Sequence, residues 1–279
     1  VLHRNEVDPM AAAPALIHEC SHKQSSCQVR IHFHNAYELL FVKKGNMRIN
    51  INGNVYDGSP GSVFVIGRFE EHELEARSAE YERWYVILDA TRVEQLITER
   101  RLLAPLRNRG ADFCHRIDVS PFIDRFTVLF RRLLEEYEHP ADCAELMQIS
   151  LITELLILLR RADPASGQAG KAIPGSVLAV QTYIENHFAE PVSITELAGK
   201  VYMTACHLSH CFKSATGYSP KQYLVLCRIA CAKDLLASTE LPVSEVALRA
   251  GYSDVNNFIR TFRKESGLTP LRYRERQRT

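Results

Sequence analysis

The sequence predicts an α+β protein with two domains: a front domain built on a β-barrel that carries a helical hairpin, and a back domain that is entirely helical. Three observations support this prediction. Short runs of alternating polar and apolar residues fill the region 29–88, apolar residues at helical spacing follow position 120, and the pattern beyond position 176 repeats itself. The chain has 279 residues, 46% of them hydrophobic and 24% charged, which suits about two domains and excludes a disordered or collagen-like protein.

Turn signals divide the front region into short strands. In the stretch RININGNVYDGSPGSVFVIG, Asn52-Gly53 is typical of a type I′ hairpin turn, and Asp57-Gly58 and Pro60-Gly61 separate the strands that follow. Strands joined by such tight turns pair in the antiparallel direction. We therefore expect a small antiparallel barrel or sandwich within residues 1–90.

Helical spacing begins after the strands. Ser120 and Pro121 are a good N-cap and first-turn pair, and apolar residues continue at helical spacing to Tyr137. After the turn HPADC, a second helix is predicted over roughly Ala144 to Arg161, with an apolar stripe formed by Leu146, Ile149, Ile152, Leu155, Leu156 and Leu159. The two helices form an antiparallel hairpin in a helical region at 91–162. Their apolar faces either cover the barrel or form the seam of a homodimer.

A linker and a change in charge separate the two halves. The stretch DPASGQAGKAIPGS is rich in Pro, Gly, Ala and Ser and has no apolar period, so we expect a flexible linker over 163–175. From Lys171 onward 14 Lys and Arg oppose 9 Asp and Glu, a net charge of +5, whereas the front part has 20 against 24, a net charge of −4. A basic back half favours a polyanionic partner.

The sequence favours a cytoplasmic protein with reduced thiols. The most apolar run, Leu151 to Leu159, is about half as long as a bilayer requires and contains Glu154, so no transmembrane helix is expected. The first residues lack the basic end and apolar segment of a secretory signal. The eight cysteines contain no CxxC pair, which argues against a disulfide framework or a paired-cysteine metal site.

Two copies of one pattern follow the linker: SITELAGKVYMTACHLSHCFKSATGYSPKQY and VSEVALRAGYSDVNNFIRTFRKESGLTPLRY. Matching residues are 49 positions apart in the first part of each copy and 50 apart in the last part. Each copy has the helix start and stop signals of a helix-turn-helix. A capping box at Ser193 and Glu196 opens the first short helix, Thr204 or Ser253 caps the second, Gly217 or Gly267 ends it, and Ser219-Pro220 or Thr269-Pro270 starts a third.

The second helix of each copy presents a polar face. The outward residues are Cys206, Ser209, His210 and Lys213 in the first copy and Asn256, Ile259, Arg260 and Arg263 in the second. Such donors reach bases and phosphates, although any exposed helix carries polar residues. Between the copies, the 17 residues from Lys221 to Ala237 form a continuous helical pattern about 26 Å long. That length suits a rod that holds two recognition helices near the roughly 34 Å between successive faces of the major groove.

The second copy, EVALRAGYSDVNNFIRTFRKESGLTPLRYR, resembles the signature of the AraC family of bacterial transcription regulators, and the resemblance covers about residues 176 to 276. It implies a DNA-binding domain over 176–279 with two helix-turn-helix units. By position, it implies base contacts from Cys206, Ser209, His210, Val255, Asn256 and Arg260, and phosphate contacts from Asn257, Lys213 and Arg263. His210 stands where Arg is common in the family, so the family's operator sequences do not carry over.

The front region resembles the cupin-type sensor domain of the same family, through HFHNAYELLFVKKG, PGSVFVIG and His72. His32, His34, Glu38 and Gly45 have the spacing of the first cupin motif, and His72 has the place of the histidine in the second. The resemblance implies a cupin-like, effector-binding barrel over 1–90. We expect a pocket for a small-molecule effector near His34, Glu38, His72 and Trp84, with Arg83 as a further candidate.

The histidines leave an alternative open. His32 and His34 share a strand face by parity, Glu38 follows them, and His72 completes a set of imidazoles and one carboxylate that suits Fe, Mn or Zn. The front domain would then be a metal-dependent cupin dioxygenase or isomerase fused to a DNA-binding domain. A second alternative is a thiol sensor or zinc site formed by the cysteines and histidines of the back half, Cys206, Cys211, Cys227, Cys231, His207 and His210.

The favoured interpretation is a ligand-responsive regulator of the AraC type, without catalytic residues and without a cofactor. Its expected partners are double-stranded operator DNA, a small-molecule effector, RNA polymerase and a second copy of the chain. The effector would act by favouring one arrangement of barrel, hairpin and linker, and so of the DNA-binding heads, over another. Whether the regulator activates or represses stays open at this stage.

Overall fold

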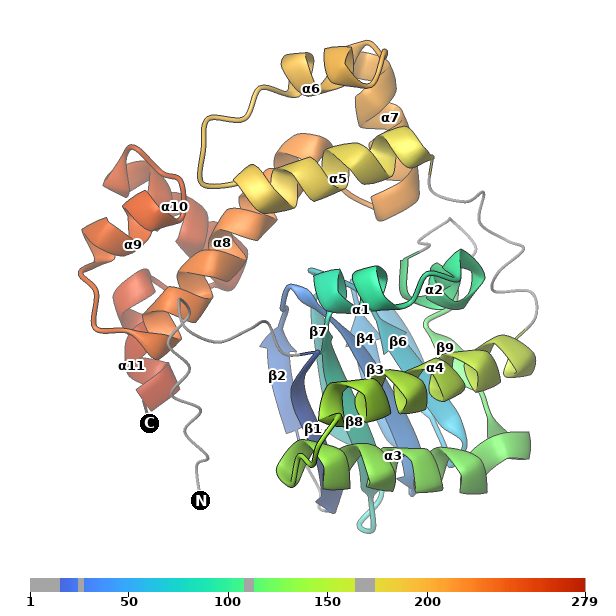
Figure 1. Ribbon diagram of the computed structural model, residues 1–279. Helices are drawn as coiled ribbons and strands as arrows, with labels where there is room; N and C mark the ends of the chain where they lie inside the picture. The colour runs from blue at the N-terminus through green and yellow to red at the C-terminus, as the bar shows by residue number, and fades with distance from the viewer. Residues whose placement is uncertain (1–15, 25–27, 108–112, 164–173, 279) are drawn as a thin grey trace. The chain divides into compact units, whose positions relative to one another are not determined.

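The computed structural model describes residues 16–24, 28–107, 113–163 and 174–278 (Figure 1). The described residues separate into two compact units, an N-terminal unit that ends at residue 163 and a C-terminal unit that begins at residue 174. The predicted linker, 163–175, falls almost wholly outside the described residues, although its last residue, Gly175, already begins a helix. Among the described residues, no helix combines the length and the apolar character needed to cross a membrane.

Two antiparallel sheets form the framework of the N-terminal unit (Figure 1). The first has the order β1-β8-β3-β6-β9 and contains β1 (Ile17–Gln24), β8 (Glu82–Asp89), β3 (Ala36–Lys44), β6 (Ser62–Ile66) and β9 (Arg116–Asp118). The second has the order β2-β7-β4-β5 and contains β2 (Gln28–His32), β7 (His72–Ala76), β4 (Met47–Ile51) and β5 (Asn54–Gly58). An apolar core formed by residues of both sheets, including Leu40, Ile49 and Phe64, lies between them.

The turns between strands agree with the sequence prediction. Asn52 and Gly53 join β4 to β5 with φ values of 49° and 84°, the positive values that a type I′ turn requires at both central residues. Strand β9 was not foreseen, because Arg116–Asp118 lies in the region predicted to be helical. It pairs with β6 through Val63 and Ile117 and extends the first sheet.

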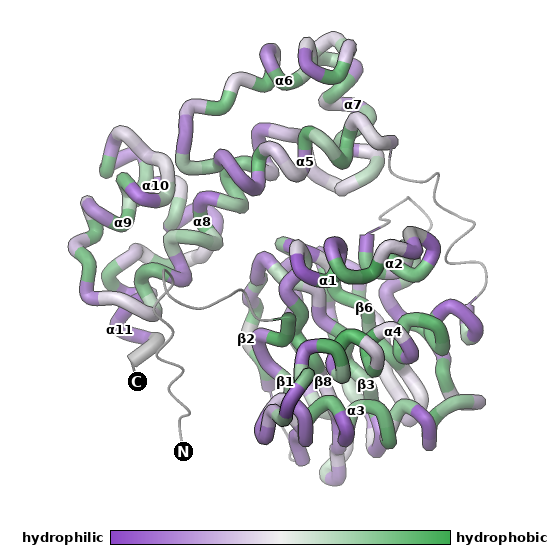
Figure 2. The backbone as a smooth tube through the Cα atoms, viewed as in Figure 1, coloured by the Kyte–Doolittle hydropathy of each residue, from purple (hydrophilic) through white to green (hydrophobic). Residues whose placement is uncertain are grey.

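Helices cover the outer face of the first sheet. After α1 (Ala90–Leu96) and α2 (Arg100–Arg107), the hairpin consists of α3 (Ile123–Glu138) and α4 (Ala144–Ala162). Figure 2 shows hydrophobic and hydrophilic residues alternating along both hairpin helices, as amphipathic helices require. Their apolar residues share one core with the outward residues of the sheet. Phe130 of α3 belongs to this core, together with Phe41 and Trp84 of the sheet.

The hairpin differs from the prediction in two details. Ser120 and Pro121 belong to a short 3-10 helix, η1 (Ser120–Phe122), and α3 begins only at Ile123. Leu146 does not join the buried stripe of α4, because its side chain is 64% exposed whereas Ile152, Leu155 and Leu159 are fully buried. The hairpin therefore covers the sheet within this chain, which was one of the two predicted roles for its apolar faces.

The C-terminal unit contains α5 (Gly175–His187), α6 (Ile194–Lys200), α7 (Ala205–Thr216), α8 (Pro220–Ser238), α9 (Val243–Arg249), α10 (Val255–Ser266) and α11 (Pro270–Arg278). Helix α8 runs from the group formed by α5, α6 and α7 to the group formed by α9, α10 and α11 (Figure 1). Its 19 residues correspond to about 28 Å, so the predicted rod is present and slightly longer than expected.

The caps of the two helix-turn-helix units are as predicted, with two corrections. Ser193 accepts from the Glu196 backbone N–H, but within the described part of the chain the capping box with both bonds is formed by Ser219 and Gln222 at the start of α8. Ser193, Thr204 and Ser219 accept hydrogen bonds from the first turns of α6, α7 and α8. In the second unit Asp254, rather than Ser253, caps α10 by accepting from the backbone N–H groups of Asn256 and Asn257. Ser253 is the extra residue of the second copy, since Thr204 and Asp254 are the corresponding caps at an offset of 50.

We expect Phe130→Ala to destabilise the N-terminal unit by about 3–5 kcal/mol, because it leaves a cavity between the hairpin and the sheet. The Phe130 ring is fully buried and stacks at 5.8 Å on Phe41. Urea unfolding can be followed through the fluorescence of Trp84, the only tryptophan of the chain, whose ring lies 6.4 Å from Phe130. Val128→Ala is the matched control, because Val128 lies on the same helix and is 46% exposed. It should change the stability by less than about 0.5 kcal/mol.

Candidate functional sites

The second helices of the two units, α7 and α10, have the same mode of attachment. Leu208 and Phe212 anchor α7, and Phe258 and Phe262 anchor α10, all four fully buried. Gly217 and Gly267 end the helices with φ values of 81° and 71°. One face of each helix is thus committed to the core, and the opposite face is left for other contacts.

The predicted DNA-contacting residues lie mainly on these outer faces. On α7, Cys206, His210 and Lys213 are exposed, whereas Ser209 is half-buried and its hydroxyl donates to the Ala205 carbonyl at 2.7 Å. On α10, Asn256, Asn257, Arg260 and Arg263 are exposed, whereas Val255 is half-buried.

The α10 face is organised for a polyanion. Arg260 Nη2 donates to Asn257 Oδ1 at 3.2 Å, which orients both side chains on the helix surface. A shallow hollow beside them is lined by Asn256, Ile259, Arg260, Arg263, Lys264 and Thr269. Three cationic side chains and the Asn256 amide therefore line one hollow, and such an amide suits base edges. Lys264 and Thr269 were not among the predicted contacts, because helical parity alone does not show which neighbouring element completes a groove.

The surroundings of Cys231 in the C-terminal unit disfavour a reactive thiolate. Burial and, to a smaller extent, the nearby Asp234 together raise the pKa of Cys231 to about 11. Cys227 is buried in the core of α8. Cys211 Sγ lies 3.6 Å from His207 Nε2 on α7, a local contact between residues four apart. A thiol sensor requires a thiolate near neutral pH, so this arrangement favours a structural use of the buried thiols.

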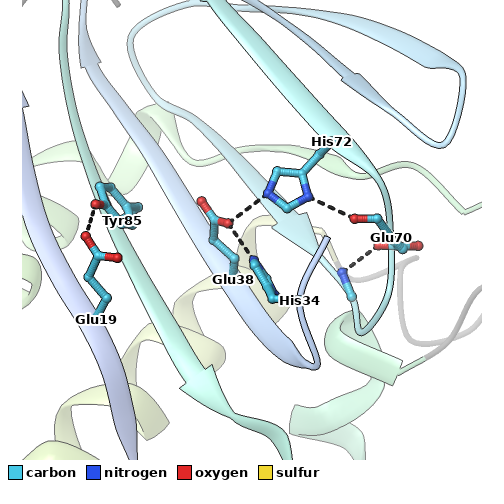
Figure 3. Close-up of polar contacts among 7 residues, drawn as sticks. Glu19, His34, Glu38, Glu70, His72 and Tyr85 are labelled. Atoms are coloured by element: carbon cyan, nitrogen blue, oxygen red, sulfur yellow. Dashed lines mark hydrogen bonds and ion pairs between the residues drawn. The ribbon is translucent and has the colours of Figure 1, made fainter. Parts of the chain in front are cut away.

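The second candidate site is a cluster of histidines around one carboxylate in the N-terminal unit (Figure 3). Glu38 on β3 is only 6% exposed because its side chain points between the two sheets. His72, at the start of β7, pairs in register with His32 at the end of β2, and His34 lies in the segment between β2 and β3. Three segments of the chain thus converge on Glu38.

Glu38 is held as a carboxylate by two imidazoles. Its Oε2 lies 3.2 Å from His34 Nε2 and 3.2 Å from His72 Nε2 (Figure 3). Burial alone would raise the pKa of Glu38, but the hydrogen bonds to His34 and His72 outweigh burial and lower that pKa well below its ordinary range. Burial would lower the pKa of His72, and its contact with Glu38 raises that pKa above the ordinary 6.5.

The orientation of the His72 ring limits what can lie between it and Glu38. Its Nδ1 donates to the backbone carbonyl of Glu70 at 2.9 Å, so Nδ1 carries a proton. In the neutral ring Nε2 is then an acceptor that faces a carboxylate oxygen. The contact becomes favourable when a proton or another cation occupies the space between the two atoms.

A second layer of polar residues supports this ring and was not predicted. The Glu70 carboxylate lies 3.1 Å from His115 Nε2, and His115 Nδ1 lies 3.0 Å from the Tyr56 hydroxyl. Glu70 and His115 are both nearly buried. No sequence motif marked this pair, because 45 positions separate the two residues. The local contact of Glu70, whose carboxylate accepts from the backbone N–H of Gly67, does not point to His115.

The three histidines could hold a metal ion by their geometry. One nitrogen from each of His32, His34 and His72 lies within 4.8 Å of the others. Two nitrogen ligands at about 2.1 Å from one ion are at most about 4.2 Å apart, so small side-chain rotations would suffice. Among the described residues, the buried Nδ1 atom of His34 has no hydrogen-bond partner. The backbone carbonyl of Glu70 accepts from His72 Nδ1, which is a usual support for a ligating imidazole.

Trp84 does not belong to this cluster, contrary to the prediction. Trp84 pairs with Phe41 across β3 and β8, packs against Phe130 of the hairpin and stacks on His22 at 4.1 Å. Side chains of consecutive strand residues point to opposite faces, so it is the neighbouring Arg83 that points between the sheets. Arg83 is buried there, with its guanidinium 5.7 Å from the centres of the Tyr81 and Tyr85 rings.

The chain matches two known domain families. Residues 15–156 match the AraC-like ligand binding domain, which is more than half of the chain, and residues 197–276 match a helix-turn-helix domain. The HTH-type transcriptional activator RhaS of Citrobacter koseri is 27% identical over 99% of this chain and 97% of its own length. The probable transcriptional regulator LumQ of Photobacterium leiognathi is 32% identical over 52% of this chain and 58% of its own.

Among solved structures, ToxT from Vibrio cholerae with a bound unsaturated fatty acid is similar in fold. The TM-score is 0.61, with 95% of this chain and 97% of the other chain covered and 13% sequence identity. At this identity the similarity concerns the fold alone.

We expect Glu38→Gln to destabilise the N-terminal unit by about 1–3 kcal/mol, because it removes the charge on which two imidazoles depend. The measurement is urea unfolding monitored by Trp84 fluorescence. Glu75→Gln is the control, since Glu75 is 49% exposed and pairs only at the surface with Arg77. Equal stability of the Glu38 and Glu75 variants would show that the buried carboxylate does not organise the cluster.

Proposed function

Because the chain belongs to the AraC family of transcription regulators, with a ligand-binding domain and a helix-turn-helix domain in one polypeptide, we propose that it works as an effector-controlled transcription activator and not as an enzyme. The observation that carries this proposal is the pair of helices α7 and α10, which bury corresponding residues at an offset of 50 and expose polar faces. Activation is proposed from the similarity to RhaS, which is a transcriptional activator.

In this proposal the two helices contact DNA through different chemistry. On α10, Asn256 suits adenine and Arg260 suits guanine, with Val255 as an apolar neighbour, while Asn257 and Arg263 bind phosphates. On α7, Cys206, Ser209 and His210 contact base edges and Lys213 binds phosphate. The α7 face has fewer bidentate donors, so we expect α10 to contribute the larger share of sequence discrimination.

The effector is proposed to bind in the N-terminal unit at His34, Glu38 and His72. These three side chains offer imidazole and carboxylate groups to a small polar molecule, and Glu38 connects β3 to the segment between β2 and β3 and to the start of β7. A ligand that competes for Glu38 would alter the contacts among these strands. Through the sheet and its covering hairpin, that change would favour one presentation of the DNA-binding heads over another.

A divalent metal is the second candidate for this site, favoured by the three histidine nitrogens within 4.8 Å. His32, His34 and His72 would be the ligands, with Glu38 as a fourth. A bound ion would lie where His72 Nε2 faces the carboxylate and would remove the need for a proton there. The metal-dependent enzyme interpretation depends on such an ion and on a substrate that occupies an open coordination position.

The remaining partners are proposed on general grounds. An activator of this type works in the cytoplasm, where it reaches the chromosome and RNA polymerase. Homodimerisation would use the outer side of the hairpin, where Val128, Leu146 and Met147 remain exposed. Sedimentation velocity of the intact chain, compared with Leu146→Glu, distinguishes a dimer formed by this surface from a monomer.

For DNA binding we expect Arg260→Ala to lose about 1–3 kcal/mol on the preferred duplex and to relax the choice of base at one position. Lys213→Ala should weaken binding to preferred and random duplexes alike, because a phosphate contact does not depend on sequence. Fluorescence anisotropy with a duplex selected from a random pool, and with an unselected duplex, measures both effects. A loss of equal size on the two duplexes for Arg260→Ala would contradict base contact by this residue.

For the N-terminal site we expect native mass spectrometry to detect a co-purified small molecule that is lost in Glu38→Gln. Elemental analysis of the same sample tests the metal. One equivalent of iron, manganese or zinc that disappears in the His32→Ala/His34→Ala variant would favour the metal and revive the enzyme interpretation. His22→Ala is the control, because His22 lies outside the cluster and pairs with Glu82 at 2.9 Å.

A further inference from the structure

A half-buried contact centred on Arg228 of the connecting helix α8 joins the first helix-turn-helix unit to the second. Arg228 Nε donates to the Phe188 carbonyl at 2.7 Å, and Nη2 donates to the Glu190 carbonyl at 2.9 Å. Both acceptors lie in the segment that follows α5, on the side of the first unit. The same guanidinium lies 5.5 Å from the centre of the Tyr252 ring, which belongs to the turn of the second unit.

The backbone of the second unit approaches the same segment directly. Gly251, in the turn between α9 and α10, has a φ of 83°. A Cβ atom built on Gly251 would lie 2.7 Å from the Phe188 carbonyl oxygen and 2.8 Å from the Ala189 Cα. These atoms belong to the backbone and cannot move aside as a flexible side chain would. Only glycine permits this close packing, so the turn of the second unit rests on the end of the first.

The chemistry of the contact specifies an orientation as well as an attachment. A guanidinium is planar and its donors have a fixed fork, so the two carbonyls of one chain segment and the ring of another define its plane. The hydrogen bonds are charge-assisted and partly shielded from water, and burial lowers the pKa of Arg228. Lys221 of the same helix also carries a positive charge, but its side chain is exposed whereas Arg228 is half-buried.

The spacing of the two recognition helices depends on more than the length of α8. The length of α8 fixes the distance between α7 and α10. The rotation of one helix-turn-helix unit relative to the other, about the axis of α8, depends on contacts away from that axis. Since one turn of B-DNA contains about 10–10.5 base pairs, each base pair added between two half-sites rotates the second by roughly 35°. A regulator that tolerates one spacing therefore needs a contact that resists such a rotation.

We propose that the junction of Arg228 with Phe188, Glu190 and Tyr252, closed by Gly251, fixes the rotational phase between α7 and α10 and so selects one spacing of half-sites in the operator. Arg228 is a positioning residue in this scheme, because it acts through the two helices and does not itself contact DNA. The proposal goes beyond DNA binding as such, since it assigns the choice of spacing to residues outside both recognition faces.

The test is a selection from a random-sequence duplex library with the full-length chain, compared with Arg228→Met. The wild-type protein should enrich two motifs at one separation. The variant should enrich the same two motifs with separations spread over neighbouring base pairs. In binding titrations, the preference of the wild type for its own spacing over one longer by two base pairs should be roughly tenfold and should largely disappear in the variant.

Two further variants separate this effect from a general loss of stability. Lys221→Met removes one charge from the same helix and should keep the single spacing. Gly251→Ala disturbs the junction from the opposite side and should broaden the spacing as Arg228→Met does. If Arg228→Met does not fold, Arg228→Lys decides by the same measurement, because lysine keeps the charge but lacks the planar fork.

A single sharp spacing in Arg228→Met, or in Arg228→Lys where that variant is used, would overturn the proposal. Enrichment of only one motif by the wild type would also overturn it, because a single reading helix needs no fixed phase.

Discussion

The burial of both faces of the first sheet is the constraint on which the N-terminal unit depends. Strand β3 is buried from Ala36 to Val42, because one face packs on the hairpin and the other on the second sheet. A charged residue on such a strand has no access to bulk water and needs partners within the fold. Glu38 is that residue, and His34 and His72 are its partners. The candidate effector site thus follows from how the sheet is covered.

The C-terminal unit solves a different problem with duplicated parts. Two pairs of buried apolar residues hold α7 and α10, and matching caps and glycine stops define their ends. Folding therefore uses only the inner face of each helix. The outer faces are free to differ, and they do, with small or weakly selective groups on α7 and amide and guanidinium groups on α10. One scaffold can in this way present two unlike contact surfaces to a single duplex.

Sequence reasoning grouped neighbouring residues more reliably than it found contacts between distant segments. It grouped His34, Glu38 and His72 through local motifs, and Asn256 and Arg260 through helical parity, and the roles of these residues stay predictions. It placed Trp84 in the wrong group, since parity tells which residues share a face of β8 but not which face is covered by the hairpin. It missed Glu70 and His115 because their contact joins distant parts of the chain.

The sequence by itself determined the features that depend on neighbours a few positions away: the turn at Asn52 and Gly53, the presence of the two hairpin helices, and the repeat with most of its caps. Tertiary structure decided which faces are interior, that Arg116–Asp118 pairs as a strand, and that Arg228 meets Phe188 40 positions before it. The physical reason is that turns and helices are governed by local hydrogen bonds and backbone angles. Contacts between distant segments depend on how whole elements pack, and no local pattern encodes that packing.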